Sequence, residues 1–149
     1  MILGFLDKHK DVGLLFLRVS IGLIFVWHGY PKIMGGPSQW HVMGRVLQDI
    51  GIQAFPAFWG FMAAFAEFIG GLFIILGIGT RLFAILLTLL MSLIMFLSLK
   101  QGAGALIASP FLKDIIIFLS LVIMGSGKYS VDELLIKAVA KEGSLKPKD

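Results

Sequence analysis

Glu67 is the residue in this chain most able to do chemistry, because it is the one charged residue in a long apolar stretch, residues 54–79. A stretch of that length can cross a bilayer, which takes about 20 residues as a helix. An ionisable side chain at that depth costs about 3 kcal/mol or more unless it finds a partner. We therefore expect Glu67 to face protein and to pair with a cation.

Three cationic or titratable residues near the N-terminus form a polar stripe on the first span. At 100° per residue, His28 and Lys32 fall about 80° and 40° from Arg18, on one side of a helix. Counting about 1.5 Å per residue places Glu67 and Asp114 at a similar level, with Arg18 below them and His28 above. We expect Arg18 to be the partner of Glu67, since a guanidinium fork matches a carboxylate, and His28 is the alternative. The predicted buried polar or ligand-binding residues are Arg18, His28, Lys32, Glu67 and Asp114.

Plainer roles remain open for these residues. A buried Arg18–Glu67 pair can serve only to fix the helix register. His28 can be an interfacial hydrogen-bonding residue instead of a proton-handling or ligand-binding one. Lys113 and Asp114 can simply mark the headgroup level, although Asp114 is deep enough to face the bundle.

Small residues surround Glu67 in the sequence. Gly70 and Gly71 follow it, and Ala63 lies one turn before it. Small residues at such spacing let membrane helices approach closely. We expect Ala63, Gly70 and Gly71 to be helix-packing positions that keep the acid away from lipid.

The elements that must position these residues are long apolar segments. The chain is 58% hydrophobic and 15% charged, with a mean hydropathy of +0.93, which is typical of a membrane protein. Continuous apolar runs of this length predict helices, because the backbone in lipid must satisfy its own polar groups. We predict an all-α integral membrane fold, an antiparallel four-helix transmembrane bundle formed as a single domain over residues 1–149. The predicted spans cover about residues 12–30, 55–79, 82–99 and 111–127.

Two further helices are predicted at the membrane surfaces. A short amphipathic helix over about residues 38–50 would place Trp40, Met43, Leu47 and Ile50 on one face, at the outer surface or in the mouth of the bundle. A C-terminal interfacial helix over about residues 131–141 would begin at a capping box, with Ser130 three residues before Glu133.

The distribution of positive charge predicts the orientation. With the N-terminus inside, the cytoplasmic side collects eight basic residues, namely Lys8, Lys10, Arg81, Lys128, Lys137, Lys141, Lys146 and Lys148. The exterior side collects four, namely Lys32, Arg45, Lys100 and Lys113. This asymmetry favours cytoplasmic N- and C-termini. Because the basic residues are spread among loops and ends, no nucleic-acid partner is expected.

Several classes of chemistry lack the residues they need. The chain has no cysteine, so it offers no thiolate metal site or thiol redox centre. No dinucleotide fingerprint, phosphate loop or paired metal-binding histidines occur, and we predict no metal. A quinone remains a candidate cofactor, because it needs an apolar slot with one or two hydrogen-bond donors.

Three motifs, in order along the chain, resemble the DoxX family. The first is Leu17-Arg18-Val19 followed by Gly22 to Gly29 and Lys32. The second is Ala66-Glu67-Phe68-Ile69-Gly70-Gly71-Leu72, which runs on to Arg81. The third is Gly125-Ser126-Gly127-Lys128-Tyr129-Ser130-Val131-Asp132. The resemblance covers about residues 14–134, and its matching polar and glycine positions are Arg18, His28, Lys32, Glu67, Gly70, Gly71 and Asp132.

The resemblance implies a small four-span protein of the bacterial inner membrane. The family takes its name from a subunit associated with thiosulfate:quinone oxidation, and some relatives are linked to membrane complexes for oxidative-stress defence. It therefore implies a component of a redox-linked membrane complex, an oxidoreductase subunit that draws electrons from a partner or bound cofactor. Whether the chain is itself an enzyme stays open.

Two other functions also stay open. The chain could be a non-enzymatic scaffold or assembly factor, or a proton-coupled small-molecule transporter that uses Glu67 as the carrier acid. The expected partners are the lipid bilayer, proteins of a membrane redox complex and further copies of the chain.

Overall fold

The computed structural model describes residues 9–144; Lys8, Lys146 and Lys148, which enter the charge comparison, lie outside this range. Over these residues the chain forms helices and no strand, so the predicted all-α fold is confirmed. The elements are α2 (Lys10–Met34), α3 (Gly36–Gly44), the 3-10 helix η1 (Arg45–Ile50), α4 (Pro56–Leu76), α5 (Thr80–Lys100), α6 (Ala105–Met124) and α7 (Val131–Ser144).

Four of these helices, α2, α4, α5 and α6, are long and apolar enough to cross a membrane. Their outward faces carry large exposed apolar side chains, such as Phe16, Trp27, Leu89 and Ile123. A soluble protein rarely exposes so much contiguous apolar surface, whereas lipid solvates it. The chain is therefore a multi-pass membrane protein.

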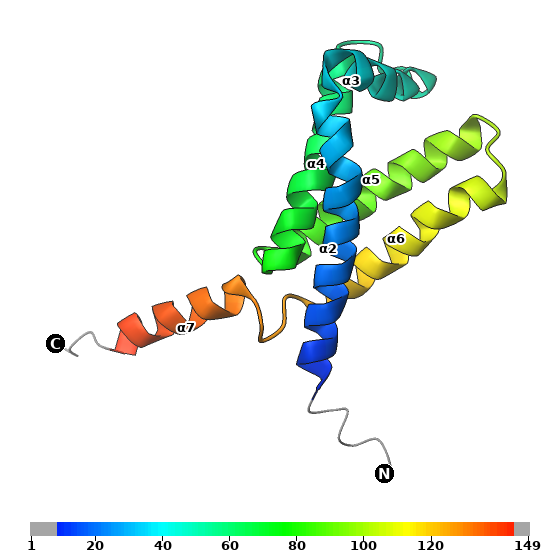
Figure 1. Ribbon diagram of the computed structural model, residues 1–149. Helices are drawn as coiled ribbons and strands as arrows, with labels where there is room; N and C mark the ends of the chain where they lie inside the picture. The colour runs from blue at the N-terminus through cyan, green and yellow to red at the C-terminus, as the bar shows by residue number, and fades with distance from the viewer. Residues whose placement is uncertain (1–8, 145–149) are drawn as a thin grey trace.

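The four spans are arranged as two pairs. Helices α2 and α4 pack along one another, as do α5 and α6, and the second pair runs obliquely to the first (Figure 1). Helix α3 lies against the end of α4, at the opposite end of the molecule from the start of α7 (Figure 1). We call these two ends of the bundle the α3 end and the α7 end.

Helices α2 and α4 approach closely because glycines of each helix face the backbone of the other. A Cβ atom on Gly71 would lie 2.8 Å from the carbonyl oxygen of Gly22, and one on Gly29 would lie 2.7 Å from the amide nitrogen of Phe68. Real Cβ contacts are never this short, so only glycine fits at these positions. These two contacts fix which residues of α2 and α4 share a level.

The core joins both helix pairs near the middle of the molecule. The ring of Phe25 in α2 meets the ring of Phe118 in α6 edge to face, with centroids 4.7 Å apart. Ile74, Leu87 and Leu121 are fully buried around them. From this contact toward the α3 end the two pairs diverge (Figure 1).

Two helices run through prolines that lie just outside the predicted spans. Helix α2 continues past Pro31 to Met34, and α6 begins at Ala105, ahead of Pro110. Proline leaves the carbonyl four residues earlier without its backbone donor. In α6 that carbonyl belongs to Leu106, and the hydroxyl of Ser109 donates to it at 3.1 Å.

The two predicted surface helices are present with modified bounds. The segment predicted over residues 38–50 is the pair α3 and η1. Helix α7 starts at Val131, and the hydroxyl of Ser130 accepts a hydrogen bond from the amide of Glu133 at 3.2 Å, as the capping motif predicted. The Asp132 carboxylate accepts from the amide of Gly79 at 2.9 Å, which attaches the start of α7 to the turn between α4 and α5.

Candidate functional site

A cavity of about 650 Å³ lies between the two helix pairs on the α3 side of the Phe25–Phe118 contact. Its walls are mainly apolar and come from α2, α3, η1, α4, α5 and α6. Its volume is in the range of ligand-binding pockets. The polar side chains among its lining residues are His28, Lys32, Gln39, Glu67, Ser98, Gln101 and Asp114.

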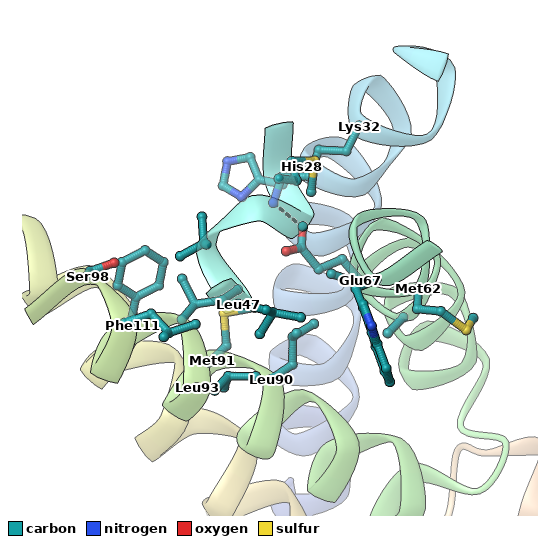
Figure 2. A pocket seen from close by; sticks show the side chains of 18 of the residues that line it. His28, Lys32, Leu47, Met62, Glu67, Leu90, Met91, Leu93, Ser98 and Phe111 are labelled. Carbon is teal, nitrogen blue, oxygen red and sulfur yellow. Dashed lines mark hydrogen bonds and ion pairs between the residues drawn. The ribbon is translucent and has the colours of Figure 1, made fainter. Parts of the chain in front are cut away.

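Lys32 and Glu67 form an ion pair at the cavity wall. The Lys32 ammonium lies 2.5 Å from the Glu67 carboxylate (Figure 2). The Glu67 side chain is 3% exposed, whereas that of Lys32 is 33% exposed. The expectation that Glu67 faces protein is confirmed, but its cation is Lys32 and the predicted Arg18–Glu67 pair is wrong.

Local structure places Lys32 above this acid. Because α2 continues past Pro31, Lys32 stands about one turn beyond Gly29, the residue that packs on the backbone of Phe68. The indole of Trp40 in α3 donates to the carbonyl oxygen of Lys32 at 2.9 Å. The ammonium then reaches back along α2 to the level of Glu67.

Arg18 lies at the α7 end instead, outside the cavity. The side chain is buried, and its guanidinium donates to four carbonyl oxygens, those of Ile74, Ile75, Ser126 and Tyr129. The contact between Gly29 and Phe68, the residue next to Glu67, places Arg18 eleven residues along α2, roughly 16 Å, from that level. The last carbonyls of α4 have no partner within the helix, so they provide the acceptors that a carboxylate was expected to supply.

His28 lies one helical turn before Lys32 on the same face of α2. It lines the cavity and is exposed (Figure 2). Its ring offers a second N–H group beside the ammonium of Lys32. His28 and Lys32 are thus two donors on one wall.

Asp114 lines the cavity from α6. Its side chain is 14% exposed, and its Oδ1 atom is buried without a hydrogen-bond partner. The ammonium of Lys113 is 3.4 Å from that oxygen, but it forms no hydrogen bond to it and is itself largely exposed.

The three small residues beside Glu67 have different surroundings. Gly71 faces α2 and Gly70 faces Leu87 of α5, while Ala63 lines the cavity. Four of the five predicted polar site residues therefore meet at one cavity, and Arg18 does not.

The segment between α2 and α4 contributes to the cavity wall. Met43 and Leu47 were predicted on the apolar face of a helix at the outer surface or in the mouth of the bundle, and both line the cavity, together with Gln39. Asp49 in η1 accepts hydrogen bonds from Lys100 and Gln101 at the end of α5, and so connects this segment to the second helix pair. The apolar periodicity of residues 40–50 indicated burial of one face, and it left open whether that face meets lipid or the mouth of the bundle.

The cavity can bind an apolar ring with polar substituents. One wall presents the ammonium of Lys32, which has three donors and uses one for Glu67. Figure 2 shows Phe111 of α6 across the cavity from Glu67. A flat apolar ligand between these walls would reach donors at one edge, and Asp114 offers an acceptor from α6.

Comparison with known proteins places the chain in a family. The DoxX family model matches residues 13–99. The inner membrane protein YqjF of Escherichia coli (strain K12) is 34% identical over 140 residues, which cover 89% of this chain and 98% of that protein. A Bacillus subtilis (strain 168) protein named "Putative oxidoreductase CatD" is 33% identical over 84 residues, 56% of this chain and 58% of that protein. No solved structure matches the chain.

The family match spans α2, α3, η1, α4 and nearly all of α5. It therefore includes His28, Lys32 and Glu67, and the YqjF alignment extends over most of the remaining chain. The chain belongs to the DoxX family.

Proposed function

We propose that this protein binds a quinone headgroup in the cavity and serves as a membrane-embedded component of a redox-linked complex. The observation that carries the proposal is the Lys32–Glu67 pair in the wall of a mainly apolar cavity. Glu67 holds the ammonium in place and balances its charge, while the unused N–H groups of Lys32 point to a ligand oxygen.

The cavity fits a quinone in both size and chemistry. A quinone ring is flat and apolar, and its carbonyl oxygens accept hydrogen bonds. Lys32 and His28 supply donors on one wall, and Phe111, Leu90 and Met91 supply apolar contacts on the other side (Figure 2). A bound quinone would supply two-electron redox chemistry, for which the electrons would come from a partner protein.

Relatives lend this proposal indirect support. The name of CatD describes an oxidoreductase, and the DoxX resemblance implies quinone-linked complexes. The transporter alternative receives less support, because a carrier acid must exchange its proton freely and Glu67 is held by Lys32. The scaffold alternative does not account for the polar residues that line the cavity.

We further propose that the protein lies in the bacterial inner membrane with both termini in the cytoplasm. Charge asymmetry supports this orientation. Since the chain has no cysteine, single cysteines can report the topology. Gln53→Cys should react with a membrane-impermeant maleimide in intact cells, whereas Ala140→Cys in α7 should react only after the cells are opened; the reverse pattern would refute the orientation.

Quinone binding can be tested with the purified protein in lipid nanodiscs. Titration with decylubiquinone should quench the fluorescence of Trp59, which lines the cavity, and Trp59→Phe should remove most of that quenching. Lys32→Met should weaken binding about tenfold or more, because hydrogen bonds to charged groups contribute about 1.5–3 kcal/mol.

The matched control is Lys128→Met. Lys128 also pairs with an acid, Asp11 at 3.2 Å, but at the α7 end. It should bind decylubiquinone as the unmodified protein does. Absence of saturable binding to the unmodified protein, or equal binding after Lys32→Met, would reject the proposed site.

A further inference from the structure

The way in which the cavity is covered indicates how the proposed quinone reaches it, an inference that rests on the proposed function. The contact between Phe25 and Phe118 limits the cavity toward the α7 end. Toward the α3 end the cavity is covered by α3 and η1, and Asp49 in η1 accepts hydrogen bonds from Lys100 and Gln101 of α5. The cover therefore lies between the cavity and the α3 end of the molecule.

The two sides of the cavity are covered unequally. On one side α4 and α5 are joined by a short turn and contact each other, and η1 packs against both. On the other side lie α2 and α6. Within residues 9–144, the extensive backbone contact of α6 is with α5 alone. The two helix pairs also diverge toward the α3 end (Figure 1), so the side between α2 and α6 is the less covered one.

The helical register of α2 places His28 on this less covered side. At 100° per residue, Gly22 and Gly29, which face α4, lie about 60° and 40° to one side of Phe25. His28 lies about 60° to the other side, and Ile24 about 100°. His28 lines the cavity and is exposed, and Ile24 is 44% exposed. The cavity wall therefore continues past His28 onto the lipid-facing surface of α2.

Helix α6 supplies the opposite edge of this opening. Phe111 lines the cavity, and Pro110 both lines the cavity and is exposed. The next residue, Leu112, is 49% exposed. These residues belong to a helix that is long and apolar enough to cross the membrane, as does α2. Apolar surface thus leads from the cavity to the outside of α6 at a depth where lipid surrounds the protein.

We infer that the ligand enters sideways from the bilayer between α2 and α6, and that the site takes a quinone with a long apolar tail. We call this passage the α2/α6 opening; its edges are Ile24 and His28 on α2 and Pro110 and Phe111 on α6. The headgroup lies at Lys32, and the tail stays in the opening and in lipid. A tail that left through the α3 end would instead be exposed to water, which apolar groups avoid.

A photoreactive quinone tests this route on the unmodified protein in nanodiscs. The probe is an analogue of decylubiquinone with a diazirine in the middle of its tail. After irradiation, mass spectrometry of peptides should find label on residues 24–31 of α2 and residues 107–116 of α6, and excess decylubiquinone should displace it. Displaceable label on residues 38–52 would show that the tail leaves at the α3 end. Displaceable label on α4 and α5 would show that it leaves on the opposite side, and either result would overturn the inference.

Two neighbouring residues of α2 provide matched variants, since the chain has no cysteine of its own. Ile24→Cys and Leu23→Cys each place one thiol on exposed apolar surface, but Leu23 lies about 160° from Phe25 and away from the opening. Modification with N-cyclohexylmaleimide before reconstitution should slow the association of decylubiquinone severalfold in Ile24→Cys and leave it unchanged in Leu23→Cys. Stopped-flow quenching of Trp59 measures both rates, and equal rates in the two modified variants would contradict entry at Ile24.

The possible results separate this inference from the proposed function. Saturable binding of decylubiquinone without displaceable label on α2 and α6 would overturn the α2/α6 opening as the route and leave the quinone site standing. If decylubiquinone does not bind to the unmodified protein, the proposed function fails and this inference fails with it. If the modified variants do not fold, photolabelling of the unmodified protein still decides the route.

Discussion

Lys32 and Glu67 meet between α2 and α4 as unequal partners, since the lysine side chain is one-third exposed and the carboxylate is buried. The ammonium stands near the α3 end of α2, where a small rotation of its flexible stem would return it to polar surroundings. Glu67 stands in the interior of α4 and has no such route. The two residues therefore depend on each other to different degrees.

This inequality predicts asymmetric effects on stability. Lys32→Met strands a buried carboxylate and should lower the free energy of unfolding by about 3 kcal/mol. Glu67→Gln should cost roughly 1 kcal/mol, because the lysine can turn outward. Thermal unfolding in mild detergent measures both effects. The double variant should be close to Glu67→Gln alone, and additive costs would show that the two residues do not interact.

Arg18 should act on stability and not on ligand binding. Its guanidinium joins the last turn of α4 to the segment between α6 and α7 through bonds to Ile74, Ile75, Ser126 and Tyr129. Arg18→Met should destabilise the protein by about 3 kcal/mol, since several buried acceptors lose a charged donor. Arg18→Lys should rescue it only in part, because an ammonium lacks the planar fork.

Hydrogen exchange locates the expected effect of Arg18. In Arg18→Met, amides of residues 125–132 should exchange faster, while decylubiquinone should bind the folded fraction unchanged. Weaker quinone binding by the fully folded variant would return Arg18 to the ligand site and contradict its place in the structure.

The sequence predicted the spans well because lipid imposes a length and an apolar composition on each of them. Helix ends were harder to predict at prolines. Pro31 and Pro110 lie just outside the predicted spans, yet both are inside helices, and Ser109 replaces one missing donor. A proline leaves one backbone carbonyl without its usual N–H donor. Periodicity alone does not show which side chain replaces that donor.

The ion pair could not be predicted because its level depends on the contact between two helices. Depths counted from the span ends placed Arg18 within reach of Glu67. The actual register follows from Gly29 on Phe68 and Gly22 on Gly71, and it brings Lys32 to the acid. These glycines were visible in the sequence, but their partners on the facing helix were not.

The glycine contacts themselves give a prediction with an internal control. Gly71→Ala would push a methyl group against the backbone of α2, with the Gly22 oxygen at 2.8 Å and the Val26 amide nitrogen at 3.0 Å. Backbone atoms in packed helices cannot yield easily, so we expect a loss of about 1–3 kcal/mol. Gly13→Ala in α2 meets nothing within 4 Å and should stabilise the helix by up to about 1 kcal/mol.

Thermal unfolding of both glycine variants checks this difference in sign. The substitutions are chemically identical, so helix propensity cannot explain opposite effects. A Gly71→Ala variant as stable as Gly13→Ala would mean that α2 and α4 do not approach as closely as the structure shows.

The segment that covers the α3 end of the cavity should be held to the second helix pair by Asp49. This residue receives hydrogen bonds from the ammonium of Lys100 and from the amide of Gln101, the latter at 2.7 Å. The double variant Lys100→Met/Gln101→Ala removes both donors. These exposed hydrogen bonds contribute about 1 kcal/mol, so their loss should speed amide exchange in residues 45–52 roughly fivefold.

The rest of that segment should respond differently, because α3 is attached to α4 by backbone contact. A Cβ on Gly44 would lie 1.8 Å from the carbonyl oxygen of Pro56, and one on Gly60 would lie 1.8 Å from that of Trp40. Exchange in residues 38–43 should therefore stay unchanged in the double variant, and Gln53→Ala in the adjacent loop should leave both regions unchanged. Equal acceleration across residues 38–52 would show that α3 and η1 move together and that Asp49 holds both of them.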